Sequence, residues 1–188
     1  MKPTLLLHVC CATCAAYVLE LLREDYDVTA YYYNPNIYPD KEYQVRFLEV
    51  QTYCATHKIS FVQEQPDKEA WFEKTKGHET DPERGNRCTI CYQMRLRKTA
   101  TYARDHNFSI FGTDLSISPH KDAKRLNEIG NELAREYGTT YLEADFKKRD
   151  GFKKAMEISR KENFYRQDYC GCIYSMQARQ ACDFNKLQ

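Results

Sequence analysis

The sequence predicts an α/β protein with a Rossmann-like parallel sheet, helices on both faces of the sheet and a helical C-terminal section. Short apolar runs alternate with stretches of helical spacing, which is typical of parallel sheets. The first run, Thr4 to Val9, is almost continuously apolar, as expected of a strand buried on both faces. From Lys147 onward no strand pattern remains, so this part is expected to be helical.

The predicted elements follow one another with short connections. Strands are expected at residues 4–9, 28–33, 59–62, 108–112 and 140–144. Helices are expected at residues 12–23, 43–57, 68–75, 88–106, 121–137, 151–163 and 174–181. Asn34-Pro35-Asn36 ends the second strand, and the charged segment 77–86, with its Pro and Gly, is expected to be a mobile surface loop.

The chain of 188 residues has the size of one domain. We expect an α/β core over residues 1–146 and a helical section over 147–188. With 28 Lys and Arg against 27 Asp and Glu, the net charge of the protein is too small to attract nucleic acid by itself. No apolar run approaches the roughly 18 residues of a spanning helix, and the apolar start lacks the length and cleavage site of a signal peptide. These features predict a cytoplasmic protein without a membrane partner.

Nine cysteines are the unusual feature of the composition. An odd number without an export signal argues against a disulfide framework and favours metal ligands or redox thiols. Cys54 and Cys182, each alone on a predicted helix, are expected to fill the core. The other cysteines form three groups, which are Cys10 with Cys11 and Cys14, Cys88 with Cys91, and Cys170 with Cys172.

The first two groups offer ligands for a metal centre. The first follows a strand and opens a helix, where backbone N–H groups lower thiol pKa values. Two thiolates from each group make the set of four that either zinc or a [4Fe–4S] cluster accepts. The Cys-x-x-Cys pair is also compatible with a thioredoxin-type redox pair, and members of the first group could be small core residues. The spacing does not choose among these.

The third group, Cys170-Gly171-Cys172, suits electron exchange. Two residues of chain span at most roughly 7 Å, which allows a disulfide in a strained ring, and strained disulfides are easily reduced. Six cysteines in three groups also exceed the four of one closed zinc site. A structural role for the pair is the alternative.

Two polar segments are candidates for substrate contacts. In the loop after the fourth predicted strand, Asp114 and His120 could orient a polyhydroxylated substrate or supply protons, whereas helix capping by Ser118 is the alternative. Residues 147–166 have a local basic excess that could face phosphates, although a solvated helix face is the commoner explanation for such a run. The candidate RNA-binding residues are Lys147, Lys148, Lys153, Lys154, Arg160, Lys161 and Arg166.

Four segments together resemble the signature segments of the QueH family of epoxyqueuosine reductases. The resemblance runs nearly end to end and implies an oxidoreductase that removes the epoxide oxygen of epoxyqueuosine in the tRNA wobble position, without cobalamin. The segments are His8-Val9-Cys10-Cys11-Ala12, Gly85-Asn86-Arg87-Cys88-Thr89-Ile90-Cys91-Tyr92, Ser116-Ile117-Ser118-Pro119-His120-Lys121 and Tyr165-Arg166-Gln167-Asp168-Tyr169-Cys170-Gly171-Cys172.

The resemblance also implies roles for individual residues. A [4Fe–4S] cluster is expected on Cys10, Cys11, Cys88 and Cys91, and a redox-active pair at Cys170 and Cys172. Cys14 could bind an additional iron or simply lie nearby. An external electron donor must reset the pair. Thr13 stands where family members often have proline, which should alter loop stiffness more than chemistry. The candidate proton donors are Asp114, His120 and Asp168.

Two other classes of protein remain compatible with these residues. A structural zinc protein that binds RNA would use the same four thiolates, hold one zinc and contain no sulfide. A metal-free thiol–disulfide oxidoreductase would work through Cys88 and Cys91 or through Cys170 and Cys172. A thioredoxin-like fold, however, places its Cys-x-x-Cys just after an early strand, and the early pair here is Cys-Cys.

Overall fold

The computed structural model describes residues 1–185, with side chains up to Cys182. Five parallel strands form one sheet in the order β3-β2-β1-β4-β5, which confirms the Rossmann-like prediction. All predicted strands are present, the last of them shorter than expected. The strands are β1 (Thr4–His8), β2 (Asp27–Tyr32), β3 (Ser60–Gln63), β4 (Ile110–Thr113) and β5 (Thr140–Tyr141).

The predicted helices are present too, with ends shifted by a few residues. A short 3₁₀ helix, η1, follows β4 and was not predicted, because four residues are too few for a periodic pattern. Its start is fixed by the hydroxyl of Thr113, which accepts from the N–H of Leu115. The helices are α1 (Ala12–Leu22), α2 (Asp40–Thr56), α3 (Lys68–Thr75), α4 (Asn86–Asp105), η1 (Asp114–Ile117), α5 (Ala123–Tyr137), α6 (Gly151–Lys161) and α7 (Ile173–Asn185).

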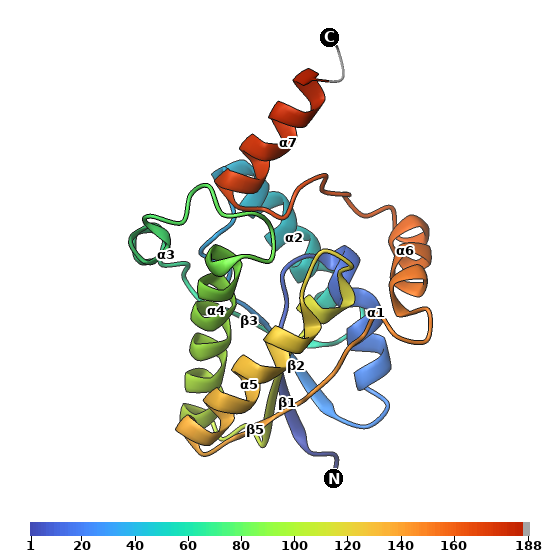
Figure 1. Cartoon of the computed structure of the whole chain (residues 1–188). Helices are drawn as coiled ribbons and strands as arrows, with labels where there is room; N and C mark the ends of the chain where they lie inside the picture. Colours follow the sequence, from blue (N-terminus) through green and yellow to red (C-terminus); the bar gives the residue numbers. More distant parts are fainter. Residues whose placement is uncertain (186–188) are drawn as a thin grey trace.

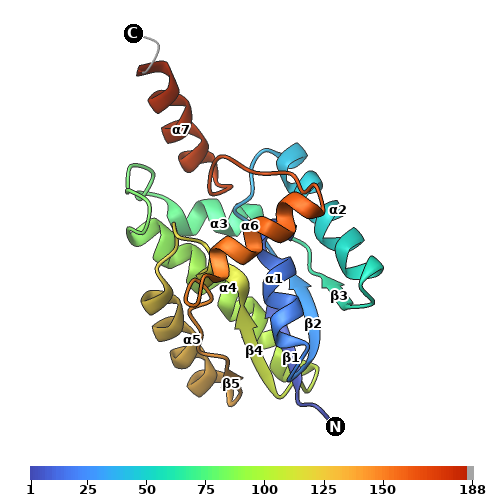
Figure 2. The ribbon, with the colours of Figure 1, turned by 90° about the vertical axis from the view of Figure 1, so that its right-hand side faces the viewer.

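Helices cover both faces of the sheet (Figures 1 and 2). Successive side chains of a strand point to opposite faces, and β1 divides accordingly. Leu5 and Leu7 belong to a cluster with α1, α2 and α6, whereas Leu6 belongs to a cluster with α4 and α5. All three leucines are fully buried. The apolar run of β1 is therefore explained by burial on both faces.

The direction in which the chain adds strands reverses between β1 and β4. These strands are neighbours in the sheet, although about 100 residues separate them, and His8 pairs with Thr113 at their carboxyl ends. In open α/β sheets this reversal creates the crevice in which ligands bind. The cysteine loop after β1 and the polar segment after β4 therefore lie at the same end of the sheet.

The C-terminal section contributes two helices. Helix α6 lies beside α1 (Figures 1 and 2), and its Ala155 belongs to the core cluster under α1. Helix α7 extends away from the rest of the molecule in both views. The single-domain organisation stays a prediction, and residues 186–188 of the predicted 147–188 section lie outside the described residues. No helix in the described part of the chain is long and apolar enough to cross a membrane.

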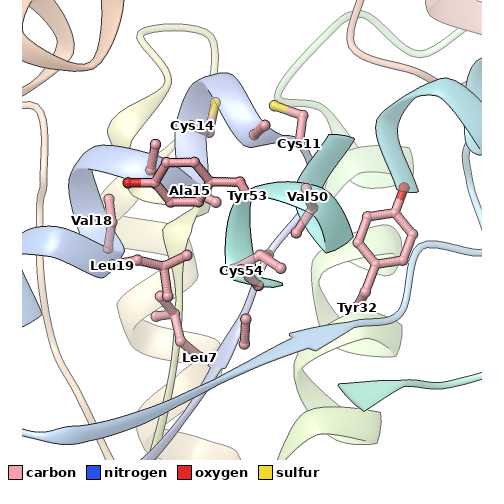
Figure 3. Packing of buried hydrophobic residues seen from close by; sticks show 14 of the residues in the cluster. Leu7, Cys11, Cys14, Ala15, Val18, Leu19, Tyr32, Val50, Tyr53 and Cys54 are labelled. Atoms are coloured by element: carbon pink, nitrogen blue, oxygen red, sulfur yellow. The ribbon is translucent and has the colours of Figure 1, made fainter. Parts of the chain in front are cut away.

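The two isolated cysteines have different environments. Cys54 lies inside the cluster of α1, α2 and β1, close to Val50 (Figure 3), and burial raises the pKa of its thiol to about 12. Its prediction as a core residue is confirmed. The same prediction for Cys182 is wrong, because this thiol is exposed on α7, which projects from the body of the protein.

The buried face of α1 offers a matched test of the core. We predict that Leu19→Ala lowers the free energy of unfolding by about 2–5 kcal/mol, because it removes a fully buried side chain. Leu21→Ala, on the same helix but 40% exposed, should change it by about 0.5 kcal/mol or less. Urea unfolding measures both. Equal effects would contradict the assignment of the buried face.

Candidate active site

Three thiols gather where β1 ends and α1 begins. The sulfurs of Cys10, Cys11 and Cys14 all lie within 4.8 Å of one another, and those of Cys10 and Cys11 are 3.8 Å apart. Hydrogen bonds from Cys10 and Cys14 hold the pKa of Cys11 well below its usual value, whereas donation to Cys11 raises that of Cys10 to about 11. Converging thiols that favour one thiolate are a donor set for a soft metal.

Cys88 and Cys91 lie in the first turns of α4 and are both buried. The segment 77–86 at the entry to this helix lies largely on the surface, as predicted, but hydrogen bonds anchor it. The Arg87 guanidinium donates to the carbonyl oxygens of His78 and Glu79 at 3.0 and 2.8 Å. The backbone N–H of Arg84 donates to the sulfur of Cys88 at 3.3 Å. These contacts fix the entry of α4 and with it both thiols.

A buried guanidinium links the cysteine groups. Arg95 of α4 is 2% exposed and donates to Nε2 of His8 at 3.2 Å and to Oδ1 of Asn34 at 2.5 Å. Burial lowers the pKa of His8 well below its usual value, and the Arg95 charge contributes in the same direction, so the imidazole is neutral. Burial alone would lower the pKa of Arg95, but the charges of Cys91, Cys10 and Cys170 raise it. Cysteines of all three groups therefore lie near enough to this buried cation to affect its pKa.

The loop that carries the Cys-x-Cys pair is held by α2. Arg46, which is 1% exposed, donates to the carbonyl oxygens of Cys170 and Tyr169 at 3.2 and 3.3 Å. Its charge is balanced by Glu42 at 2.7 Å, and Glu42 also accepts from the hydroxyl of Tyr165 at 2.9 Å. One buried ion pair thus fixes both ends of the loop.

The same loop is also connected to the first cysteine group. The side-chain amide of Gln167 donates to the sulfur of Cys11 at 3.1 Å. The hydroxyl of Thr13, on the first turn of α1, donates to the carbonyl oxygen of Tyr165 at 3.3 Å. These two contacts bring the C-terminal loop onto the start of α1.

A pocket of about 270 Å³ opens between these segments. Cysteines of two groups border it, because Cys10 and Cys14 line it together with Cys170. Lys121 lies on its wall, and its ammonium nitrogen is 2.6 Å from the sulfur of Cys170. Burial by itself lowers the pKa of Lys121, but the charges of Cys170 and Tyr92 raise it above the usual lysine value. A thiol and a charged ammonium thus meet at the pocket wall.

The pair of cysteines in this loop divides between two environments. Cys170 is half-buried and borders the pocket, whereas Cys172 is 7% exposed and packs with Trp71 and Cys91. None of the nine cysteines forms a disulfide in the described part of the chain. Both thiols of the predicted redox pair are therefore available.

The three predicted proton donors have different positions. Asp114 is fully buried behind Cys10, whose N–H donates to its Oδ2 at 3.3 Å, and burial raises its pKa well above the usual value. His120 and Asp168 are exposed at the pocket rim. The capping alternative for Ser118 is wrong, because Asp122 caps α5 and the hydroxyl of Ser118 instead accepts from the N–H of His120.

The predicted basic patch is mostly exposed. Lys147 is the exception, since its ammonium donates to the carbonyl oxygens of Ser116 and Lys121 and pairs with Asp145. It stabilises the loop before α5 rather than projecting into solvent. Arg166 borders the pocket itself. The other exposed members of the patch are Lys148, Lys153, Lys154, Arg160 and Lys161.

Comparisons with known proteins identify the family. The sequence profile described as "QueH: Epoxyqueuosine reductase QueH" matches residues 5–178. The chain belongs to the QueH family of epoxyqueuosine reductases. It is thus an oxidoreductase of tRNA modification, and membership of the QueH family favours this function over a structural zinc protein or a metal-free oxidoreductase.

Curated QueH proteins match over most of their length. Epoxyqueuosine reductase QueH of Haemophilus influenzae is 42% identical over 174 residues, which cover 92% of this chain and 71% of the relative. The protein of the same name from Acinetobacter baylyi is 41% identical over 174 residues, covering 92% of this chain and 80% of the relative.

Solved structures support the fold. The U34-tRNA thiolase NcsA from Methanococcus maripaludis, solved with its [4Fe-4S] cluster, has a TM-score of 0.57 at 12% identity, covering 99% of this chain and 67% of that one. A predicted subunit of tRNA methyltransferase from Methanocaldococcus jannaschii has a TM-score of 0.56 at 11% identity, covering 84% and 75%. At such low identity the likeness shows a shared fold alone.

Sequence patterns missed several residues of this QueH-family site. Arg46 occupies a position of α2 that shares the apolar spacing of Phe47 and Val50, and a charge on an apolar face is a signal for a buried partner. Lys121 was predicted to begin a helix, but α5 starts at Ala123 and leaves Lys121 in the loop. Its contact with a sulfur 49 residues away has no local sequence signal.

The buried ion pair predicts the behaviour of one variant. Arg46→Met should lower the free energy of unfolding by about 3–5 kcal/mol, because it leaves Glu42 buried without its cation. It should also make the loop at residues 165–172 more sensitive to limited proteolysis. Arg125→Met, which removes the exposed pair with Glu128, should change stability by about 1 kcal/mol or less. Parent-like stability and proteolysis of the Arg46 variant would refute this role.

Proposed function

We propose that the pocket at the carboxyl ends of β1 and β4 is where epoxyqueuosine, in the wobble position of a tRNA, is reduced to queuosine. The observation that carries this proposal is the meeting of the cysteine groups, since Cys10, Cys14 and Cys170 border one pocket and Cys172 packs with Cys91 of the second group. This arrangement supports a centre that holds and moves electrons next to a substrate. A tRNA substrate also implies a cytoplasmic enzyme.

The cysteines of the first two groups would hold the cofactor. Soft thiolates are the ligand type of iron–sulfur clusters, so Cys10 and Cys11 before α1, with Cys88 and Cys91 on α4, fit a [4Fe–4S] cluster. When bound, such a cluster relays electrons and can act as a Lewis acid. An additional iron is a further part of this proposal. Cys14 supports it, together with Oδ1 of Asp114, which is buried and has no hydrogen-bond partner in the described part of the chain.

The electrons of the reaction balance with the thiols of this chain. Removing an epoxide oxygen breaks two C–O bonds, forms a C=C bond and consumes two electrons and two protons as water is released. Cys170 and Cys172 supply the two electrons when their sulfurs form one S–S bond, and the two protons come from the reduced pair and the polar groups beside it. A dithiol reductant from outside the protein then reopens the disulfide and completes the cycle.

The polar groups around the pocket are proposed to handle protons and orientation. His120 and Asp168 at the rim can meet a bound nucleoside directly. Asp114 retains a proton more readily than an ordinary aspartate, because burial raises its pKa. The exposed residues of α6 and its flanks, together with Arg166, would bind the phosphates of the anticodon arm.

Substitution of the redox pair tests the proposed chemistry. We predict that Cys170→Ser and Cys172→Ser each lower multiple-turnover reduction of epoxyqueuosine tRNA by about 10³-fold or more, because one thiol cannot deliver two electrons. Iron and sulfide content should stay at the parent level. Cys54→Ser, away from the pocket, is the matched control and should retain turnover. Parent-like turnover by either pair variant would disprove the role of the dithiol.

Charge reversal on α6 tests the proposed RNA contact. The double variant Lys153→Glu/Lys154→Glu should weaken tRNA binding by about tenfold and reduce the slope of log affinity against log salt by about two. The control variant, Arg23→Glu/Lys58→Glu, changes the same charge at the opposite, amino end of the strands. Filter binding across a salt series measures both. Equal losses for the two variants would remove α6 from the RNA-binding surface.

A further inference from the structure

The two thiols of the Cys-x-Cys pair are chemically unequal. The sulfur of Cys170 borders the pocket and contacts the Lys121 ammonium at 2.6 Å. Cys172 does not line this pocket and packs in an apolar cluster with Trp71 and Cys91. Its sulfur lies 3.4 Å from both the N–H and the hydroxyl of Ser175, at the start of α7. One thiol therefore faces the substrate space and its neighbour faces the protein.

Lys121 needs an anionic partner. Its side chain is buried, and an unpaired ammonium in such a place is costly. Among the described residues no ion pair joins Lys121 to a carboxylate, and its nearest polar contact is the sulfur of Cys170. An ammonium beside a cysteine favours the thiolate, which is the nucleophilic form of the residue. Lys121 thus has the sulfur of Cys170 as its hydrogen-bond partner.

The backbone between the thiols maintains this difference. Arg46 holds the carbonyl oxygen of Cys170, and the carbonyl oxygen of Gly171 accepts from the N–H of Tyr38 at 2.8 Å. Gly171 has a φ of +121°, a conformation that side chains disfavour, and an added Cβ would lie 3.0 Å from the Arg46 guanidinium. Glycine therefore allows the chain to turn Cys170 and Cys172 in different directions.

We infer that Cys170 is the thiolate that faces the substrate, that Lys121 is the positioning residue that keeps it in this form, and that Cys172 is the resolving thiol. This assignment rests on the proposed function. The two protons consumed in the reduction start on the sulfur of Cys172 and on the nitrogen of Lys121, and both end in water. The two electrons come from the sulfurs as the S–S bond forms. The external dithiol returns both electrons and both protons.

Alkylation of the reduced holoenzyme by iodoacetamide tests the assignment without substrate. Mass spectrometry of the peptides gives the rate at each cysteine, with the exposed Cys182 as an internal reference. We expect Cys170 to react about tenfold faster than Cys172. Equal rates, or faster reaction of Cys172, would overturn the assignment. This comparison uses the parent protein alone, so it holds whether or not a variant folds.

Variants of Lys121 test its part. Lys121→Met should lower the ratio of Cys170 to Cys182 alkylation by about tenfold, and Lys121→Arg should restore it to within about threefold of the parent. Lys124→Met, which changes an exposed lysine of α5, should leave the ratio unchanged. An unchanged ratio in Lys121→Met, or no rescue by arginine, would remove Lys121 from the assignment.

Turnover separates this inference from the proposed function. In single-turnover assays Lys121→Met should lower the rate of reduction about tenfold with the Kd for tRNA unchanged, because a positioning residue acts on the thiol and not on binding. If the parent protein does not reduce epoxyqueuosine tRNA, the proposed function fails. If it does, and the alkylation rates of Cys170 and Cys172 are equal, only the division between the thiols fails.

Discussion

The buried guanidinium of Arg95 is the constraint on which the rest of the site depends. A cation so deep in the protein is stable only if anions or hydrogen-bond acceptors lie near it. Arg95 donates to His8 and Asn34, and the charges of Cys91, Cys10 and Cys170 raise its pKa. The three groups come from distant parts of the chain. The Arg95 charge acts to lower the pKa values of Cys10 and Cys91, although donation to Cys11 and burial, respectively, keep both above the usual cysteine value.

The fold brings the groups together in two ways. The strand order places the ends of β1 and β4 side by side, so the first cysteine group lies next to the segment that begins at Asp114. The third group comes from outside the sheet and depends on side-chain anchors, chiefly the buried pair of Arg46 and Glu42. The sheet therefore positions the cysteines after β1. Cys170 is positioned by a loop that side-chain contacts anchor.

Sequence patterns predicted the sheet, its helices and the grouping of the cysteines, because these follow from periodicity and spacing. They did not predict contacts between segments that are distant in the sequence. Arg46 binds a carbonyl oxygen 124 residues away, and Lys121 binds Cys170 from a loop where the sequence predicts the start of a helix. Cys182 shows the reverse error, since the sequence predicts a core residue for a lone cysteine on a helix, but this helix projects from the body. Periodicity reports which face of a helix is apolar, not what that face meets.

The most direct test of the account is the content of iron, zinc and acid-labile sulfide in anaerobically purified protein, compared between the parent and Cys88→Ser/Cys91→Ser. The account predicts about four irons and four sulfides per chain in the parent, with a broad visible absorption, and loss of both in the variant. About one zinc per chain and no sulfide, persisting after anaerobic iron–sulfur reconstitution, would contradict it.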